Sequence, residues 1–212
     1  MGLGGALHYV GSFILFAAVI LTVIVDISAP VVDNITMLKV DNGNNHAKFG
    51  VFGWCTSGSG QSTCSDSSIG YNPAKVLEQN NFADFSNARE DTTKALTNVF
   101  VLHPVGTGVA FLAFLLSLGS TSTALSILAT LVTALAFVVN TVACVVSWVV
   151  FSLIRREVND DAAGSTAKYG PGLYLAVVAA ALCLLATVIM FVTCCAGRRR
   201  RRRESRKMMQ GY

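Results

Sequence analysis

The chain has 212 residues, of which 53% are hydrophobic and only 13% are charged. This composition excludes an ordinary soluble domain, because four uncharged runs approach or exceed the roughly 20 residues that cross a bilayer as a helix. The net charge of +4 is unevenly distributed, since eight of the sixteen Lys and Arg residues lie between Arg198 and Lys207. Such a local cluster does not indicate nucleic-acid binding. We therefore expect an all-α membrane protein.

The apolar runs divide the chain into four transmembrane helices and their connections. The predicted segments are 1–25 (first transmembrane helix), 26–98 (extracellular loop domain), 99–118 (second helix), 119–123 (cytoplasmic turn), 124–154 (third helix), 155–170 (second extracellular loop), 171–196 (fourth helix) and 197–212 (basic cytoplasmic tail). An alternative for the first run is a signal peptide cleaved near Ser28-Ala29, although no Lys or Arg precedes it.

The long outer loop carries the most distinctive stretch, Phe49-Gly50-Val51-Phe52-Gly53-Trp54-Cys55. Its aromatic and β-branched alternation is typical of a strand, and its glycines suit a bulge or a close backbone approach. We expect strands at 35–40, 46–54 and 68–71. Asn72-Pro73 then predicts the start of a helix that extends over 75–98.

Cys55 and Cys64 are separated by eight residues, mostly Ser, Thr and Gly, a length that a hairpin can close. A disulfide there would stabilise the fold by roughly 2.5–3 kcal/mol on the chain-entropy model. The alternative is a pair of free thiols in a flexible loop. The other four cysteines lie in or beside apolar runs, which indicates an oxidising side for the loop and a reducing side for the tail. Asn34-Ile35-Thr36 is a possible N-glycosylation sequon in the same loop.

Small and polar side chains recur at helical spacing in the second and third runs. They predict a helix-packing seam, typical of a left-handed four-helix bundle, made of Gly106, Ala110, Ser126, Thr133, Asn140 and Ser147. The alternative is the lining of a pore or substrate path. A transporter would usually carry a buried Asp, Glu or Lys within such runs, and these runs carry none.

The two ends of the predicted bundle differ in charge. Six arginines directly follow the fourth run, and such clusters mark the cytoplasmic side. Both termini are then cytoplasmic, although Arg155-Arg156 would lie outside. The tail predicts contact with anionic inner-leaflet lipid and acylation of its cysteines, through Cys194, Cys195, Arg198, Arg199, Arg200, Arg201, Arg202 and Arg203. The alternatives are a plain stop-transfer signal or a retrieval signal for the endoplasmic reticulum.

Gly53-Trp54-Cys55 with Cys64, following an aromatic strand, resembles the first extracellular loop of claudin-type tetraspan proteins. With Gly70-Tyr71 and Leu102-His103-Pro104, the string is similar to the fungal branch of that superfamily, the PalI and eisosomal Sur proteins. The resemblance implies a claudin-like fold, with a small disulfide-stapled extracellular β-sheet on the helix bundle. The matching motif residues are Phe49, Gly50, Gly53, Trp54, Gly70, Tyr71, His103 and Pro104. Trp54 directly precedes Cys55, which departs from the claudin spacing, so claudin receptor or paracellular roles are not implied.

His103 is either a proton sensor or an interfacial residue hydrogen-bonded to a loop. The three histidines have no metal-ligand spacing, and no serine elbow, phosphate loop or dinucleotide fingerprint occurs in the sequence. We therefore predict a protein that is not an enzyme, with no cofactor and no nucleic-acid partner.

The expected function is that of a plasma-membrane tetraspan that organises membrane domains. It would act by self-association as a homo-oligomer or by binding other membrane proteins, and its tail would bind membrane lipids. The resemblance implies a setting in eisosomes and cell-wall integrity, or in ambient-pH signalling of the PalI type. Two other interpretations are a channel or transporter subunit and an adhesion or receptor-like module that acts through the outer loop.

Overall fold

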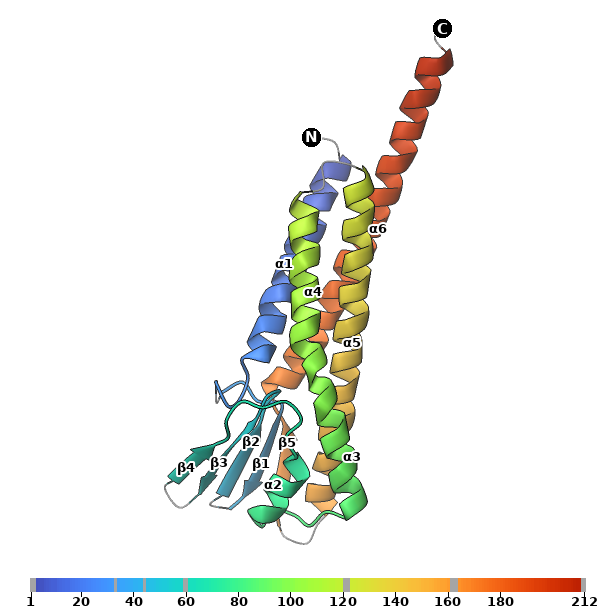
Figure 1. Cartoon of the computed structure of the whole chain (residues 1–212). Helices are drawn as coiled ribbons and strands as arrows, with labels where there is room; N and C mark the ends of the chain where they lie inside the picture. Colours follow the sequence, from blue (N-terminus) through green and yellow to red (C-terminus); the bar gives the residue numbers. More distant parts are fainter. Residues whose placement is uncertain are drawn as a thin grey trace.

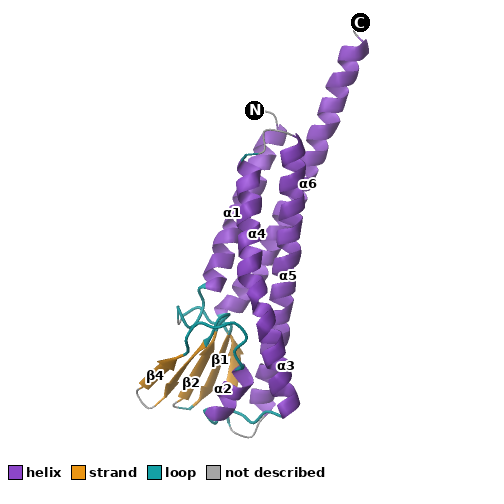
Figure 2. Ribbon diagram, in the orientation of Figure 1, coloured by secondary structure: helices purple, strands orange, loops and turns teal. Residues whose placement is uncertain are grey.

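The computed structural model describes residues 3–32, 34–43, 45–58, 61–119, 123–160 and 164–210, with side chains described from residue 7 to residue 195 apart from Thr123. Four long helices run side by side, and a small sheet lies at the end of the bundle opposite to both termini (Figure 1). Figure 2 shows the strands gathered at that one end of the molecule, with helices beside them. The predicted fold class, an apolar four-helix bundle with a small disulfide-bonded antiparallel sheet, is confirmed. The predicted left-handed twist stays a prediction.

The bundle helices are α1 (Leu3–Asp26), α4 (Leu102–Leu118), α5 (Thr123–Asp160) and α6 (Pro171–Gln210). Each overlaps one of the four segments of the described chain that are long and apolar enough to cross a membrane. A helix satisfies its backbone hydrogen bonds within itself, which lipid requires. The large side chains on the outer surface are apolar, whereas buried alanines allow the helices to approach closely: Ala110, Ala113, Ala129, Ala136, Ala143, Ala176, Ala179 and Ala186.

Two of the helical columns continue past the other bundle helices and flank the sheet (Figure 1). α4 is preceded without a break by the 3-10 turn η1 (Val99–Val101) and by α3 (Asn87–Asn98), while α5 continues to Asp160. The residues from Arg155 to Asp160, predicted as the start of a connector, are therefore helical. The reason is burial, because Ile154 and Val158 lie one turn apart on the face of α5 that packs in the outer core.

The sheet is antiparallel throughout, with the strand order β4-β3-β2-β1-β5. The strands are β1 (Leu38–Asn42), β2 (Asn45–Phe49), β3 (Trp54–Gly58), β4 (Gln61–Cys64) and β5 (Thr166–Tyr169). The predicted strand over 46–54 is two strands, separated by a turn in which the Gly50 N–H donates to Gly53 O at 2.9 Å. The predicted strand at 68–71 is wrong, because Gly70 has a positive φ of 75° and the segment is a turn.

The predicted helix over 75–98 is interrupted. α2 (Pro73–Gln79) begins as expected, with the Asn72 side chain accepting a hydrogen bond from Lys75 N at 3.2 Å and Pro73 in the first turn. The chain then leaves the helix at Asn80, and Asn81 adopts a positive φ of 55°. This break lets Phe82 enter the core, where it is 1% exposed.

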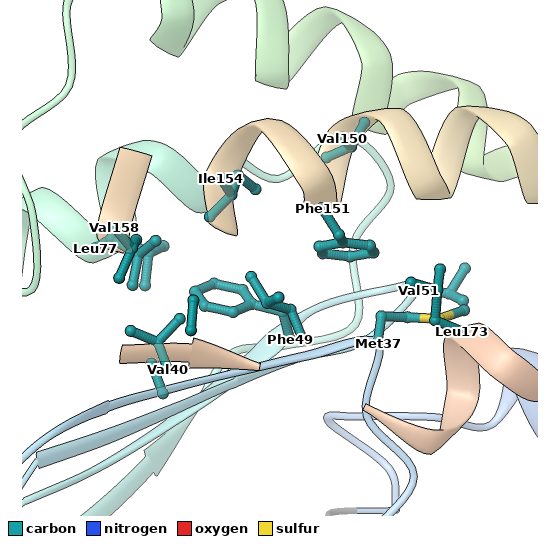
Figure 3. Packing of buried hydrophobic residues seen from close by; sticks show 14 of the residues in the cluster. Met37, Val40, Phe49, Val51, Leu77, Val150, Phe151, Ile154, Val158 and Leu173 are labelled. Atoms are coloured by element: carbon teal, nitrogen blue, oxygen red, sulfur yellow. The ribbon is translucent and has the colours of Figure 1, made fainter. Parts of the chain in front are cut away.

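One hydrophobic core joins the outer sheet to the helices. Figure 3 shows Phe49 facing Phe151, Val40 beside Leu77 and Val158, and Met37 beside Leu173. These side chains come from β1, β2, the β1 approach, α2, α5 and α6. Because they are buried together, the outer module cannot rock on the bundle without exposing this core to water.

Candidate functional site

The family-type motif of the outer loop lies where the sheet meets the membrane end of the bundle. Gly50 faces the backbone of Ala29, just after α1, so closely that any Cβ would clash with the Ala29 carbonyl oxygen. The Tyr71 hydroxyl donates to Gly50 O at 2.7 Å, and Thr97 Oγ1 at the end of α3 donates to Tyr71 O at 2.7 Å. The motif therefore ties three distant segments together.

Tyr71 is the centre of this junction. Its ring is parallel to that of Phe49, with 6.4 Å between the ring centroids and 4° between the planes. Burial raises the pKa of Tyr71 above its ordinary value. The preceding Gly70 has a positive φ of 75°, and a Cβ there would clash with the Asn98 side chain. A turn of this shape next to a packed helix end requires glycine.

The predicted disulfide is present between Cys55 and Cys64, which are opposite each other in the β3–β4 pair. The start of β3 is also bonded to the residue that follows β4, because Ser65 Oγ accepts a hydrogen bond from Trp54 N at 3.1 Å. Gly53 faces the same Ser65 hydroxyl and the Pro30 ring. Its glycine identity reflects this close approach and not a bulge.

His103 lies inside the bundle and is 5% exposed. Its Nε2 is 2.9 Å from Ser147 Oγ. The Ser147 hydroxyl donates to Ala143 O at 2.9 Å, so its oxygen accepts the hydrogen bond from His103 Nε2–H. His103 thus bonds to a neighbouring helix rather than to a loop, and Phe100 meets its ring edge-on. Pro104 follows it in the first turn of α4, where a missing N–H is tolerated.

The sequence analysis does not predict one contact of α4, which lies one turn after His103. Thr107 Oγ1 in α4 donates to Asp26 Oδ2 at the last residue of α1, at 2.6 Å. The second carboxylate oxygen, Asp26 Oδ1, is buried and has no partner among the described residues. The sequence pattern places Asp26 in the loop, because the apolar run ends at Val25. Its position one residue after that run was the available signal for a membrane-edge carboxylate.

The polar face of α5 lies toward the inside of the bundle. Thr133, Asn140 and Ser147 each donate to a carbonyl of their own helix four residues earlier, at 2.7, 2.9 and 2.9 Å. Asn140 lies against Gly106 of α4, where an added Cβ would be 2.9 Å from the amide. Ala110 is fully buried nearby on the same helix, and Ser126 is partly buried. Contacts of this kind are made where two helices pack closely against each other.

Arg155, one of the two arginines that oppose the predicted topology, has structural partners. Arg155 lies over the Tyr169 ring, 4.6 Å from its centroid, and its Nε donates to Ala167 O at 3.3 Å. Trp148 contacts Tyr169 and Tyr174, with centroids 5.0 and 6.0 Å apart. Such amphipathic rings are typical of the membrane–water interface. Further out, Glu157 forms an ion pair with Arg89 of α3.

The tail and the sequon remain untested by geometry. The backbone of α6 continues as one helix to Gln210, but the side chains from Arg198 to Arg203 lie outside the described ones. Cys194 is partly buried and Cys195 is exposed. Asn34 is exposed in the turn between α1 and β1. Among the described residues, no group of three or more His, Cys, Asp or Glu side chains could hold a metal ion.

Comparison with known proteins agrees with this architecture. The model of the SUR7/PalI family matches residues 3–190, which includes the motif, the disulfide and all four candidate spans almost completely. A search of curated proteins finds no match. The family model covers nearly the whole chain, and the chain therefore belongs to the SUR7/PalI family of tetraspan membrane proteins.

Proposed function

We propose that this protein is a non-enzymatic organiser of plasma-membrane domains that acts by lateral self-association or by binding other membrane proteins. The observation that supports this most directly is the continuous core between the sheet and the helices. A scaffold must present its outer and membrane surfaces in a fixed relation. A shared core that contains Phe49, Phe151 and Leu173, each fully buried, provides that relation.

The polar side chains of the bundle support an organiser better than a transport subunit. Thr133, Asn140 and Ser147 each donate a hydrogen bond to a carbonyl of their own helix. Asn140 lies against Gly106 of α4, and Thr133 contacts Met190 of α6. A substrate path would need such groups to remain available to a passing solute. The family is not known for enzymes.

Orientation completes the proposal. Both termini are cytoplasmic, the sheet lies outside the cell, and the arginine-rich tail contacts anionic lipid of the inner leaflet. The outer disulfide supports this, because disulfides persist on the oxidising side of a membrane. Arg155, one of the two arginines that oppose this orientation, lies over the Tyr169 ring and donates to Ala167 O.

The decisive experiment is live imaging of a C-terminal fluorescent fusion in the source cell. We expect static surface patches with slow exchange after photobleaching. A uniform or endosomal distribution would overturn the organiser role, and retention in internal reticular membranes would overturn the surface location. A variant with Gln at residues 198–203 should lose patch stability. Lys168→Gln, which removes an exposed positive charge from β5 on the outer side, is the matched control and should leave the patches unchanged.

The orientation is tested separately with two epitopes in intact cells. One epitope is inserted between Asp66 and Ser67, which lie in an exposed loop after β4. The other follows Tyr212. Antibody should stain the first without permeabilisation and the second only after it. The reverse pattern would contradict the proposed orientation.

A further inference from the structure

A small polar cavity lies on the outer module, away from the junction and from the helix seam. Its volume is about 270 Å³, and it is lined by the ends of β2, β3 and β4 and by the segment that follows α2. The side chains that matter most are Asn45, Thr56, Gln61, Thr63, Asn80 and Phe82. None of the described residues that line the cavity carries a charge.

The cavity forms because one face of the sheet changes from apolar and buried to polar and exposed between β2 and β4. Thr56 is opposite Ala47 in the β2–β3 pair, and Thr63 is opposite Thr56 in the β3–β4 pair. Opposite residues share a face of a sheet, so these threonines lie on the face that buries Ala47 and Phe49. Towards β4 this face becomes polar, and every residue of β4 is exposed. The result is a concave corner beside the core.

The wall opposite the sheet is held in place. Asn80 Nδ2 donates to Val76 O at 2.8 Å, Asn42 Nδ2 donates to Asn81 O at 3.2 Å, and Ser165 Oγ donates to Phe82 O at 2.5 Å. A wall fixed in this way loses little conformational freedom when a ligand binds. Gly58 leaves room for the Asn45 amide that borders the cavity, because any Cβ on Gly58 would clash with that amide.

The rim offers unused hydrogen-bonding groups of a specific kind. In the described part of the chain, the side chains of Asn45, Gln61 and Thr63 have no hydrogen-bond partner. Amides and hydroxyls are both donors and acceptors, whereas charged side chains are only one or the other. A sugar hydroxyl is also both. Among the described lining residues, Phe82 alone is aromatic, and it is almost fully buried.

We propose that this cavity binds a neutral carbohydrate, with the hydroxyls of one sugar unit hydrogen-bonded by Asn45, Gln61 and Thr63. An anionic ligand would need a cation in the lining. A mainly apolar ligand would need the mostly apolar lining that ligand pockets usually have, whereas this lining is mainly polar. The volume is close to the lower end of ligand pockets, which run from about 300 Å³, so one sugar unit is the expected occupant. The site faces glycans outside the cell if the proposed orientation holds, and binding itself does not depend on it.

The test uses the purified full-length protein in lipid nanodiscs. It is titrated by isothermal calorimetry with five neutral trisaccharides, maltotriose, cellotriose, laminaritriose, chitotriose and mannotriose, and with trigalacturonate as the anionic probe. We expect at least one neutral trisaccharide to bind with a Kd of about 1 mM or tighter. Loss of one hydrogen bond in Gln61→Ala or Asn45→Ala should weaken that binding about three- to tenfold.

Ser62→Ala is the matched control, because Ser62 is an exposed residue of the same strand paired with Ser57 and is absent from the cavity lining. It should leave the Kd unchanged. The proposal is overturned if none of the five neutral trisaccharides binds, if trigalacturonate binds more tightly than all of them, or if Ser62→Ala weakens binding as much as Gln61→Ala. Native thermal stability of each variant, measured first, excludes unfolding as the cause. Because the protein is purified, a failure here does not bear on the organiser role tested by imaging.

Discussion

The two sides of the outer sheet are stabilised by different means. On the β1–β2–β5 side, Val40, Phe49 and Ala167 are 0–2% exposed and pack in the core shared with α5 and α6. On the β3–β4 side, β4 is exposed at every residue and is joined to β3 by the Cys55–Cys64 disulfide. A strand of polar residues cannot rely on burial, so a covalent bond replaces it. The first side should govern global folding, and the second should govern only local order.

The largest effect is expected from a substitution on the buried β1–β2–β5 side. Phe49→Ala removes a fully buried ring between β2 and α5, and such a change costs about 3–5 kcal/mol of unfolding free energy. We expect loss of cooperative thermal unfolding in nanodiscs and retention of the protein inside the cell. Lys48→Ala, the neighbouring residue on the opposite face, is the control and should change stability by less than about 0.5 kcal/mol. Equal effects of the two substitutions would contradict the role of this core.

The next largest effect is expected from removal of the disulfide on the β3–β4 side. Replacing both Cys55 and Cys64 with Ser should lower the free energy of local opening of the β3–β4 pair by roughly 2.5–3 kcal/mol, because it releases a short ring. Hydrogen exchange measured by mass spectrometry should then speed up in β3 and β4, whereas exchange in α4 and α5 stays as in the parent protein. Faster exchange throughout the helices would show that the staple supports the whole fold. Reduction of the parent protein should reproduce the local change.

A third effect concerns the junction between the two sides. Tyr71→Phe leaves Gly50 O without its buried donor, which costs about 1–3 kcal/mol. The variant should also change the pH dependence. Burial raises the pKa of Tyr71, so the folded state holds the phenol proton more tightly than the unfolded state. Stability from this group is complete below its unfolded pKa of about 10 and is lost as pH rises further.

The matching measurement is the melting temperature of both proteins between neutral pH and about pH 11. The parent protein should lose more stability than Tyr71→Phe above pH of about 10. Parallel curves would mean that Tyr71 is not buried in solution as it is here.

A fourth effect, of about the same size as the third, lies in the helix seam. Gly106→Ala places a Cβ 2.9 Å from the Asn140 amide, and overpacking of this kind costs about 1–3 kcal/mol. Asn140→Ala makes room, so the double variant should be less destabilised than the sum of the single ones. Gly108→Ala is the control, because nothing lies within 4 Å of its added Cβ. Additive effects at Gly106 and Asn140 would contradict the contact, and flux lost without loss of stability would favour a transport path.

The sequence alone determined the four membrane helices, the disulfide and the helical start at Asn72-Pro73. These features depend on local properties: uninterrupted apolar length, cysteines a hairpin apart, and an N-cap followed by proline. It also predicted a bulge or a close backbone approach at Gly50, and the structure shows a close approach, to Ala29.

Tertiary structure alone decided the rest of the outer module. β5 reaches the sheet from the second outer loop to pair with β1, and nothing local in Thr166–Tyr169 distinguishes it from a charged connector. α5 continues past two arginines because Ile154 and Val158 are buried against the sheet. Asp26 becomes a bundle contact only because Thr107 of α4 lies beside it. Pairing, burial and buried hydrogen bonds between residues far apart in the chain depend on the packed fold, which short-range patterns do not encode.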